Sequence, residues 1–151
     1  MAVRFIVDSA ADITPAEAKD LGIIHIPLKV LFGNVEYRDA VDLSHKEFYE
    51  KLIESDTLPT TSQITPAEFA DVYEEVVAAG DTAVVVTLSS KLSGTCQSAM
   101  IAALDYEGKI FVVDSEHVSL SERILVLLGL ELAKEGLEAK AIAQRLDIEK
   151  K

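Results

Sequence analysis

The chain has 151 residues, 49% of them hydrophobic, which is typical of one folded domain over residues 1–151 rather than of a disordered segment. Its 14 Lys and Arg against 26 Asp and Glu give a net charge of −12, and this acidic field excludes nucleic acid and anionic membranes as expected partners. One cysteine excludes an internal disulfide, and each apolar run is far shorter than the ~20 residues that cross a bilayer, so we expect a soluble, cytoplasmic protein without membrane insertion.

The first half of the chain predicts two strand regions and three helices. Residues 3–7 and 23–32 are apolar and β-branched, and Pro27 with the Gly33-Asn34 turn indicates that the second region is an edge or forms a hairpin with residues 35–38. A Ser or Thr followed three residues later by Glu is a capping box, which marks a helix start. Capping boxes begin helices at Thr14–Glu17, Ser44–Glu47 and Thr65–Glu68.

The second half predicts two further strands and three helices. Strands are expected at 83–88 and 110–113, and helices are expected near Ser93, from the capping box Ser119–Glu122 and over residues 137–146. The strands are continuously apolar rather than alternating, which indicates a sheet covered on both faces. Because helices separate the strands, the sequence predicts an α/β fold with a mainly parallel sheet and helices on both faces.

Small polar side chains gather where the predicted strands end. The segment TLSSKLSGTCQSA at 87–99 follows the third strand region, and Thr61 and Ser62 lead into the third capping box. In a parallel sheet the ligand crevice lies beyond the carboxyl ends of the strands, and a helix start at Gly94 offers backbone amides to an anion. We interpret this edge as an anion cradle. Its other candidate members are Ser89, Ser93 and Thr95. Taken singly, each hydroxyl is better explained as a helix cap.

Other reactive side chains favour structural roles. Asp8 and Asp114 end two strands and are candidate acid–base groups or metal ligands, but Asp before a helix is typical of a cap, and no His or third carboxylate stands at metal-ligand spacing. Cys96 is flanked by core-type residues, which indicates a small buried side chain rather than a reactive thiol. Neither a phosphate-binding glycine loop nor a G-x-S-x-G elbow occurs. We therefore expect no enzyme activity, cofactor or metal.

A series of motifs resembles, in this order, the amino-terminal half of the DegV family. The motifs are Asp8–Ile13, Pro27-Leu28, Tyr37-Arg38-Asp39, Phe48-Tyr49, Thr61-Ser62-Gln63, Ser90–Thr95 with Gln97-Ser98-Ala99, and Val113-Asp114-Ser115. The resemblance implies a bacterial fatty-acid-binding protein that holds a long-chain fatty acid in a tunnel and can present its carboxylate to a separate fatty acid kinase. It also implies that Thr61 and Ser93 donate to the carboxylate, supported by Ser62 and Gly94, and charge-assisted bonds from hydroxyls and amides suit that role.

Two departures from the family pattern limit what the resemblance implies. Members that resemble this chain are roughly twice as long, and their second, carboxy-terminal domain, absent from these 151 residues, supplies the other tunnel wall and a histidine for the carboxylate. The bulkier segment Leu120-Ser121-Glu122-Arg123 stands where the family has a small, glycine-containing helix start. We expect this bulk and charge to narrow the crevice.

The alternative function is that of a stand-alone interaction domain that has lost ligand binding and forms a homodimer. The helix after Ser119 carries apolar residues nearly all the way round, from Leu120 to Leu132, so both of its faces need a cover. A copy of the chain can supply that cover, and so can the helix at 137–146 within one chain. An enzyme such as a phosphotransferase or hydrolase is the third hypothesis, and it rests only on Asp8 and Asp114.

Overall fold

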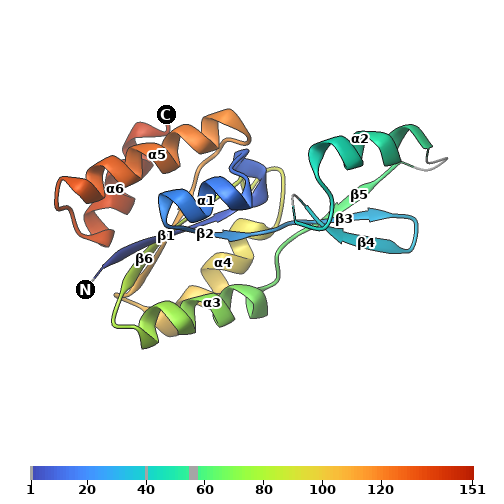
Figure 1. The fold of residues 1–151 in the computed structure, drawn as a ribbon. Helices are drawn as coiled ribbons and strands as arrows, with labels where there is room; N and C mark the ends of the chain where they lie inside the picture. Colours follow the sequence, from blue (N-terminus) through green and yellow to red (C-terminus); the bar gives the residue numbers. More distant parts are fainter. Residues whose placement is uncertain (1, 40, 55–57) are drawn as a thin grey trace.

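The computed structural model describes residues 2–39, 41–54 and 58–151. In chain order its elements are β1 (Val3–Asp8), a 3-10 turn (Ser9–Ala11), α1 (Pro15–Leu21), β2 (Ile23–Ile26), β3 (Lys29–Phe32), β4 (Val35–Arg38), α2 (His45–Glu54), β5 (Thr60–Ser62), α3 (Pro66–Ala78), β6 (Thr82–Thr87), α4 (Thr95–Ala103), a second 3-10 turn (Leu104–Tyr106), β7 (Ile110–Asp114), α5 (Leu120–Lys134) and α6 (Ala139–Glu149). Figure 1 shows that they form a layered body and a smaller arm that projects from it.

The body is built on a parallel sheet in the order β2-β1-β6-β7. All six residues of the central strand β6 are buried, which explains its nearly continuous apolar sequence. Helices α1, α5 and α6 cover one face of the sheet, and α3 and α4 cover the other (Figure 1). The predicted α/β fold, with a mainly parallel sheet and helices on both faces, is confirmed.

Each face of the sheet has its own hydrophobic core. Phe5 and Val86 pack with α5 and α6, whereas Ile6 and Val85 pack with α3 and α4, as alternation along a strand requires. Gly129 allows α5 to approach β1 closely, because a Cβ at this position would lie 2.7 Å from the Phe5 ring. The glycine in the middle of α5 is therefore a packing requirement.

The arm is an antiparallel sheet in the order β4-β3-β5, with α2 beside it (Figure 1). β3 and β4 form the hairpin that the Gly33-Asn34 turn predicts, and Gly33 has a positive φ of 63°. The strand region expected over 23–32 is divided at Pro27, so that β2 belongs to the body and β3 to the arm. Pro27 has no amide proton, and the amide of Leu28 donates to Ser9 Oγ (2.9 Å) instead of to a strand.

Three of the four predicted capping boxes are present. Thr14, Ser44 and Thr65 each accept a hydrogen bond from the amide of the Glu three residues later. The fourth prediction is wrong: within the described residues Ser119 makes no capping bond, because its φ of 60° turns it away from the helix and its hydroxyl bonds to Asp12. Glu122 points into the interior of the body instead and is fully buried.

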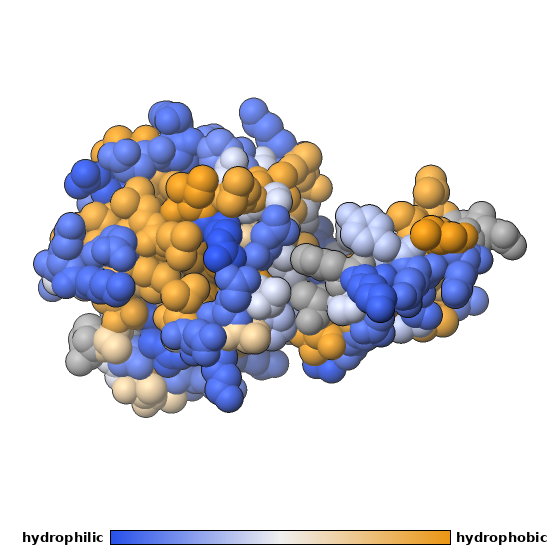
Figure 2. Space-filling model, turned by 45° about the horizontal axis from the view of Figure 1, so that its top comes forward, coloured by the Kyte–Doolittle hydropathy of each residue, from blue (hydrophilic) through white to orange (hydrophobic). Residues whose placement is uncertain are grey.

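The helix predicted near the end of the chain is α6, which packs against α5, β6 and β7. Its residues Ile142 and Leu146 are fully buried, so the within-chain cover for α5 is confirmed. Leu120 and Ile124, at the start of α5, stay 62% and 57% exposed. Figure 2 shows hydrophobic residues gathered over part of the body, whereas the arm is largely hydrophilic. The homodimer stays a prediction.

None of the helices within the described ranges combines the length and the apolar character that crossing a bilayer requires.

Candidate functional site

The carboxyl ends of β1, β6 and β7 lie together at one edge of the body, because parallel strands end on the same side. The candidate residues lie on two segments beside this edge. The loop between β6 and α4 carries three of them, the first residue of α4 is a fourth, and β5 of the arm carries two. We call the set the hydroxyl edge, and it consists of Thr61, Ser62, Ser89, Ser93, Gly94 and Thr95.

Two strand-end carboxylates hold the loop between β6 and α4 in place. Asp8 accepts hydrogen bonds from the amides of Ala10 (2.9 Å) and Leu88 (2.7 Å). Asp114 accepts from the amides of Ser90 (3.2 Å) and Glu116 (3.0 Å). Both carboxylates cap backbone turns, which is the structural role that the sequence favours for them.

Ser89 stabilises the same loop from within. Its Oγ accepts a hydrogen bond from the amide of Lys91 (3.2 Å), and its carbonyl accepts from the amides of Leu92 (3.0 Å) and Ser93 (3.3 Å). Ser89 is buried, whereas Leu92 is 65% exposed. The loop thus turns its serine inward and a leucine outward.

Ser93 and Thr95 form a pair of hydroxyls at the start of α4. Their Oγ atoms are 3.0 Å apart, and Ser93 Oγ also accepts from the amide of Thr95 (3.2 Å). Thr95 Oγ1 accepts from the amide of Ile64 (3.3 Å) and is fully buried. Among the contacts of the described residues, Thr95 has no acceptor for its proton other than Ser93 Oγ. We therefore assign the donor role to Thr95, which leaves the proton of the half-buried Ser93 free for an acceptor outside the loop.

The first turn of α4 adds backbone donors beside Ser93. Gly94 is its N-cap residue, and in the described part of the chain no side chain caps the helix. The first amides of a helix have no acceptor within the helix. Because the amide of Thr95 donates to Ser93 Oγ, the next two amides, of Cys96 and Gln97, are left for another acceptor. Cys96 itself is buried, and burial raises the pKa of its thiol, as expected for a structural cysteine.

Gln63 links the arm to this helix start, although sequence reasoning assigned it no role. Its side chain lies against Gly94, where a Cβ would overlap it, and its Nε2 donates to Ser98 Oγ (3.5 Å). Thr61 and Ser62 occupy the two preceding positions, where they pair with Val30 and Lys29 of β3. The structure therefore brings residues 63 and 64 into contact with Gly94 and Thr95, and it places Thr61 and Ser62 on the strand that leads there. The only sequence signal for Gln63 is its place in the Thr61-Ser62-Gln63 motif.

A buried pair of carboxyl groups lies beneath the hydroxyl edge. Glu122, in the first turn of α5, is fully buried, and no donor in the described residues reaches its carboxyl oxygens. Burial, and after it the charge of the nearby Asp8, raise the pKa of Glu122 to about 11, which favours a protonated carboxyl group at neutral pH. Burial also raises the pKa of Asp8. Glu122 therefore does not contribute to the narrowing of the crevice expected of the segment Leu120-Ser121-Glu122-Arg123, and for the rest of that segment the narrowing stays a prediction.

Comparison with known families identifies relatives over the whole chain. The family model described as "Uncharacterised protein, DegV family" matches residues 2–151. A DegV domain-containing protein of Deinococcus radiodurans is 36% identical over 147 residues, which are 97% of this chain and 52% of the relative. A DegV domain-containing protein of Halalkalibacterium halodurans is 38% identical over 99% of this chain and 53% of the relative. The chain thus spans about half the length of the curated relatives it matches.

Solved structures share the fold just described. A DegV family protein from Thermus thermophilus, described by its fatty acid binding, is 35% identical with a TM-score of 0.89 over 99% of this chain and 54% of that protein. DegV from Bacillus subtilis, a fatty acid binding protein, is 34% identical with a TM-score of 0.88 over the same shares. A stearic acid-binding protein from Eubacterium ventriosum is 28% identical with a TM-score of 0.85, over 97% of this chain and 52% of that protein.

Proposed function

The chain belongs to the DegV family, and from this premise we propose that it binds a long-chain fatty acid and holds the carboxylate at the hydroxyl edge. The solved relatives support the proposal, since they bind fatty acids and share the fold over nearly the whole chain. One observation carries the choice of site: the hydroxyls of Ser93 and Thr95 lie 3.0 Å apart, and with Thr95 assigned as the donor Ser93 has a proton to donate beside the first turn of α4.

A carboxylate at this position meets donors of two kinds. Ser93 donates through its hydroxyl, and the first turn of α4 donates through backbone amides at the positive end of the helix dipole. Hydrogen bonds to a charged acceptor contribute about 1.5–3 kcal/mol each, more than neutral ones. Thr61 and Ser62 on β5 and the backbone of Gly94 complete the proposed set. Ser89 and Thr95 support it from below, because both side chains are buried in the fold of the loop.

The described residues supply the head-group end of the proposed site. Leu92 is 65% exposed and directly precedes Ser93 in the sequence. Its side chain therefore offers apolar surface to the part of the acyl chain next to the carboxylate. The relatives are about twice as long as this chain, and we propose that a second half like theirs covers the remainder of the acyl chain. Affinity of these 151 residues alone is then expected to be weaker than that of a full-length relative.

We further propose that the protein is not an enzyme by itself and presents the fatty acid to a fatty acid kinase in the cytoplasm. Ser90, Lys91 and Leu92 are exposed at the turn that precedes the carboxylate donors. A second protein can therefore approach the carboxylate from the side of this turn. The proposal assigns phosphoryl transfer to the kinase and binding to this chain.

Lipid analysis of the purified protein tests the proposed function. Solvent extraction followed by mass spectrometry is expected to recover long-chain fatty acid from the protein, and isothermal titration with oleate is expected to show saturable binding once the lipid has been removed. Protein that carries no fatty acid and releases no heat with oleate would contradict the proposal.

Exposed apolar residues on α5 favour the second candidate, a dimerising interaction domain. Leu120 and Ile124 are more than half exposed, and Figure 2 shows hydrophobic residues gathered on the body. Light scattering decides between the candidates when it is combined with lipid analysis. A lipid-free dimer that Ile124→Glu converts to a 16.4 kDa monomer would favour the interaction domain, and a fatty-acid-loaded monomer would exclude it.

A further inference from the structure

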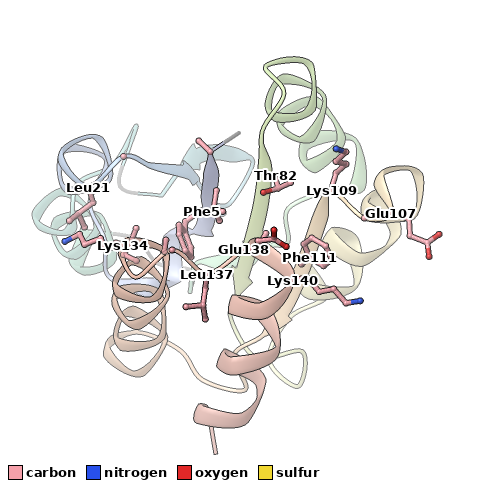
Figure 3. Close-up of a pocket in the computed structure, with 18 residues that line it drawn as sticks. Phe5, Leu21, Thr82, Glu107, Lys109, Phe111, Lys134, Leu137, Glu138 and Lys140 are labelled. Carbon is pink, nitrogen blue, oxygen red and sulfur yellow. The ribbon is translucent and has the colours of Figure 1, made fainter.

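A cavity of about 1120 Å³ lies at the end of the sheet opposite the hydroxyl edge. It opens where β1, β6 and β7 begin, beneath the connection between α5 and α6 (Figure 3). The rings of Phe5 and Phe111 and the side chains of Leu130 and Leu137 give it an apolar lining. Its volume is comparable to that of small-molecule sites in proteins, which are mostly apolar with a few polar groups.

Basic side chains stand around this cavity in an otherwise acidic protein. Three lysines, Lys109, Lys134 and Lys140, line it together with two acidic residues, Glu107 and Glu138. The chain as a whole has 26 acidic and 14 basic residues, so the balance of charge is reversed here. Lys134 pairs with Glu131 (3.4 Å), whereas Lys109 and Lys140 form no ion pair with any residue that the structure describes. The lining of the cavity therefore carries a small excess of positive charge, which favours an anionic ligand over a cationic one.

Thr82 adds a buried polar group to the lining. This residue begins β6 and is only 9% exposed, and its amide donates to the carbonyl of Ala2 (3.0 Å). Its hydroxyl has no hydrogen-bond partner within residues 2–39, 41–54 and 58–151, and it lies against the cavity (Figure 3). This hydroxyl reaches the cavity rather than lying sealed in the interior, so it can donate a hydrogen bond to a bound acceptor.

A second, shallower groove of about 540 Å³ extends the apolar lining. Phe111 and Lys140 belong to both spaces, and Met100 and Leu104 of the neighbouring segment continue the apolar surface. Leu104 is 78% exposed and Met100 is 46% exposed. A ligand whose apolar part is longer than the cavity can therefore extend into this groove along β7, where one side of it stays in contact with apolar residues.

From the apolar lining, the lysines around it and the accessible hydroxyl of Thr82, we propose that this cavity binds a small amphipathic anion. Its apolar body, a ring system or a short acyl chain, packs on Phe5 and Phe111. Its acidic group, a carboxylate, sulfonate or phosphate, lies at the mouth, where it meets Lys140 and accepts a hydrogen bond from Thr82. The site is separate from the hydroxyl edge and does not depend on the proposed function.

Glycine amides in a nitrogen–proton NMR spectrum can report on each site separately. Gly22, Gly108 and Gly136 line the cavity, Gly94 belongs to the hydroxyl edge, and Gly33 lies on the arm. The probe is 8-anilinonaphthalene-1-sulfonate, which combines two aromatic systems with one sulfonate. We expect the probe to shift the amide resonances of the three cavity glycines in a saturable manner and to leave the resonance of Gly33 unchanged.

Variants of the lining test the assigned contacts. Lys140→Glu and Thr82→Val are each expected to raise the dissociation constant of the probe about tenfold or more, whereas Lys46→Glu, the same charge change on α2, is expected to leave it within about twofold. The proposal is wrong if the probe does not shift the resonances of the cavity glycines or shifts only that of Gly94. It is also wrong if both lining variants bind the probe as tightly as the unmodified chain does.

Decanoate in the same experiment distinguishes a chain-shaped body from a ring-shaped one. If decanoate shifts the resonances of Gly108 and Gly136, the cavity also binds short fatty acids. If only the sulfonate shifts them, the cavity binds ring systems alone. Gly94 reports on the proposed function independently, so a failure at the hydroxyl edge and a failure at the cavity give different spectra.

Discussion

Ser93 and Thr95 have different surroundings although only one residue separates them. Thr95 is fully buried and joins the start of α4 to Ile64, whereas Ser93 is half-buried and bonds only within its own loop and to Thr95 among the described residues. Thr95→Val keeps the shape of the side chain but leaves the buried amide of Ile64 without an acceptor. We expect it to lower the free energy of unfolding by about 1–3 kcal/mol. Thr95→Ser keeps the hydroxyl and serves as the control in urea unfolding. Equal stability of the two variants would contradict the assigned hydrogen bond.

The buried carboxyl group of Glu122 predicts a pH-dependent stability. The pKa of Glu122 in the folded chain lies well above its ordinary value of 4.5, so the folded state binds a proton more tightly than the unfolded state. The stabilisation is therefore complete below about pH 4.5 and is lost as the pH rises, with a slope of up to about 1.4 kcal/mol per pH unit. Asp8 acts in the same direction, since its pKa is also raised.

Glu122→Gln removes this titrating proton and keeps the size of the side chain. Urea unfolding between pH 5 and 9 is expected to show a steep decline for the unmodified chain and a flatter profile for the variant. Glu131→Gln changes an exposed residue on the same helix and is the matched control. Parallel profiles for all three proteins would show that Glu122 is not protonated in the folded state.

Two glycines, one within α5 and one at the N-cap of α4, separate the packing of a helix from its ligand binding. In Gly129→Ala the new Cβ meets the buried ring of Phe5, so overpacking is expected to lower the free energy of unfolding by about 1–3 kcal/mol despite the better helix propensity of alanine. In Gly94→Ala the Cβ meets the end of the Gln63 side chain, which can rotate away. That variant is expected to remain stable and to bind fatty acid more weakly. Chemical unfolding and oleate titration of both variants check the contrast, which fails if Gly94→Ala is the less stable of the two.

Most elements of this fold are predictable from the sequence because local rules decide them. Thr14 and Thr65 cap helices as expected, and the buried strand β6 reads as continuously apolar. The exceptions depend on distant partners. The start of α5 satisfies the capping pattern at Ser119, but Asp12, 107 residues earlier, takes its hydroxyl. The division between β2 and β3 depends on Ser9, which accepts the amide of Leu28.

The candidate site is predictable to a smaller extent for the same reason. Its hydroxyls are visible in the segment after β6, but their separate roles follow from burial and from partners such as Ile64, which no spacing reveals. Gln63 reaches Gly94 only because the arm returns to the body at that point. Glu122 resembles an exposed capping residue until the sheet places Asp8 beside it.

We expect the whole molecule to bind fatty acid without catalysing a reaction on it. With ATP, magnesium and oleate, the purified chain is expected to form no acyl phosphate by itself, and addition of a fatty acid kinase is expected to produce it. Hydroxylamine trapping of the acyl phosphate measures both reactions. Turnover by the chain alone that Asp114→Asn abolishes would contradict the division, because it would give a strand-end carboxylate a catalytic role in place of the capping role described above.

The most direct test of the central claim is the affinity of Ser93→Ala for oleate, measured by isothermal titration on delipidated protein. We predict a loss of about 1–3 kcal/mol in binding free energy, roughly fivefold to 150-fold in affinity, with the free energy of unfolding nearly unchanged. Ser121→Ala, an exposed serine on α5, provides the control and is expected to bind like the unmodified chain. Unchanged oleate affinity in Ser93→Ala would contradict the assignment of the carboxylate to the hydroxyl edge.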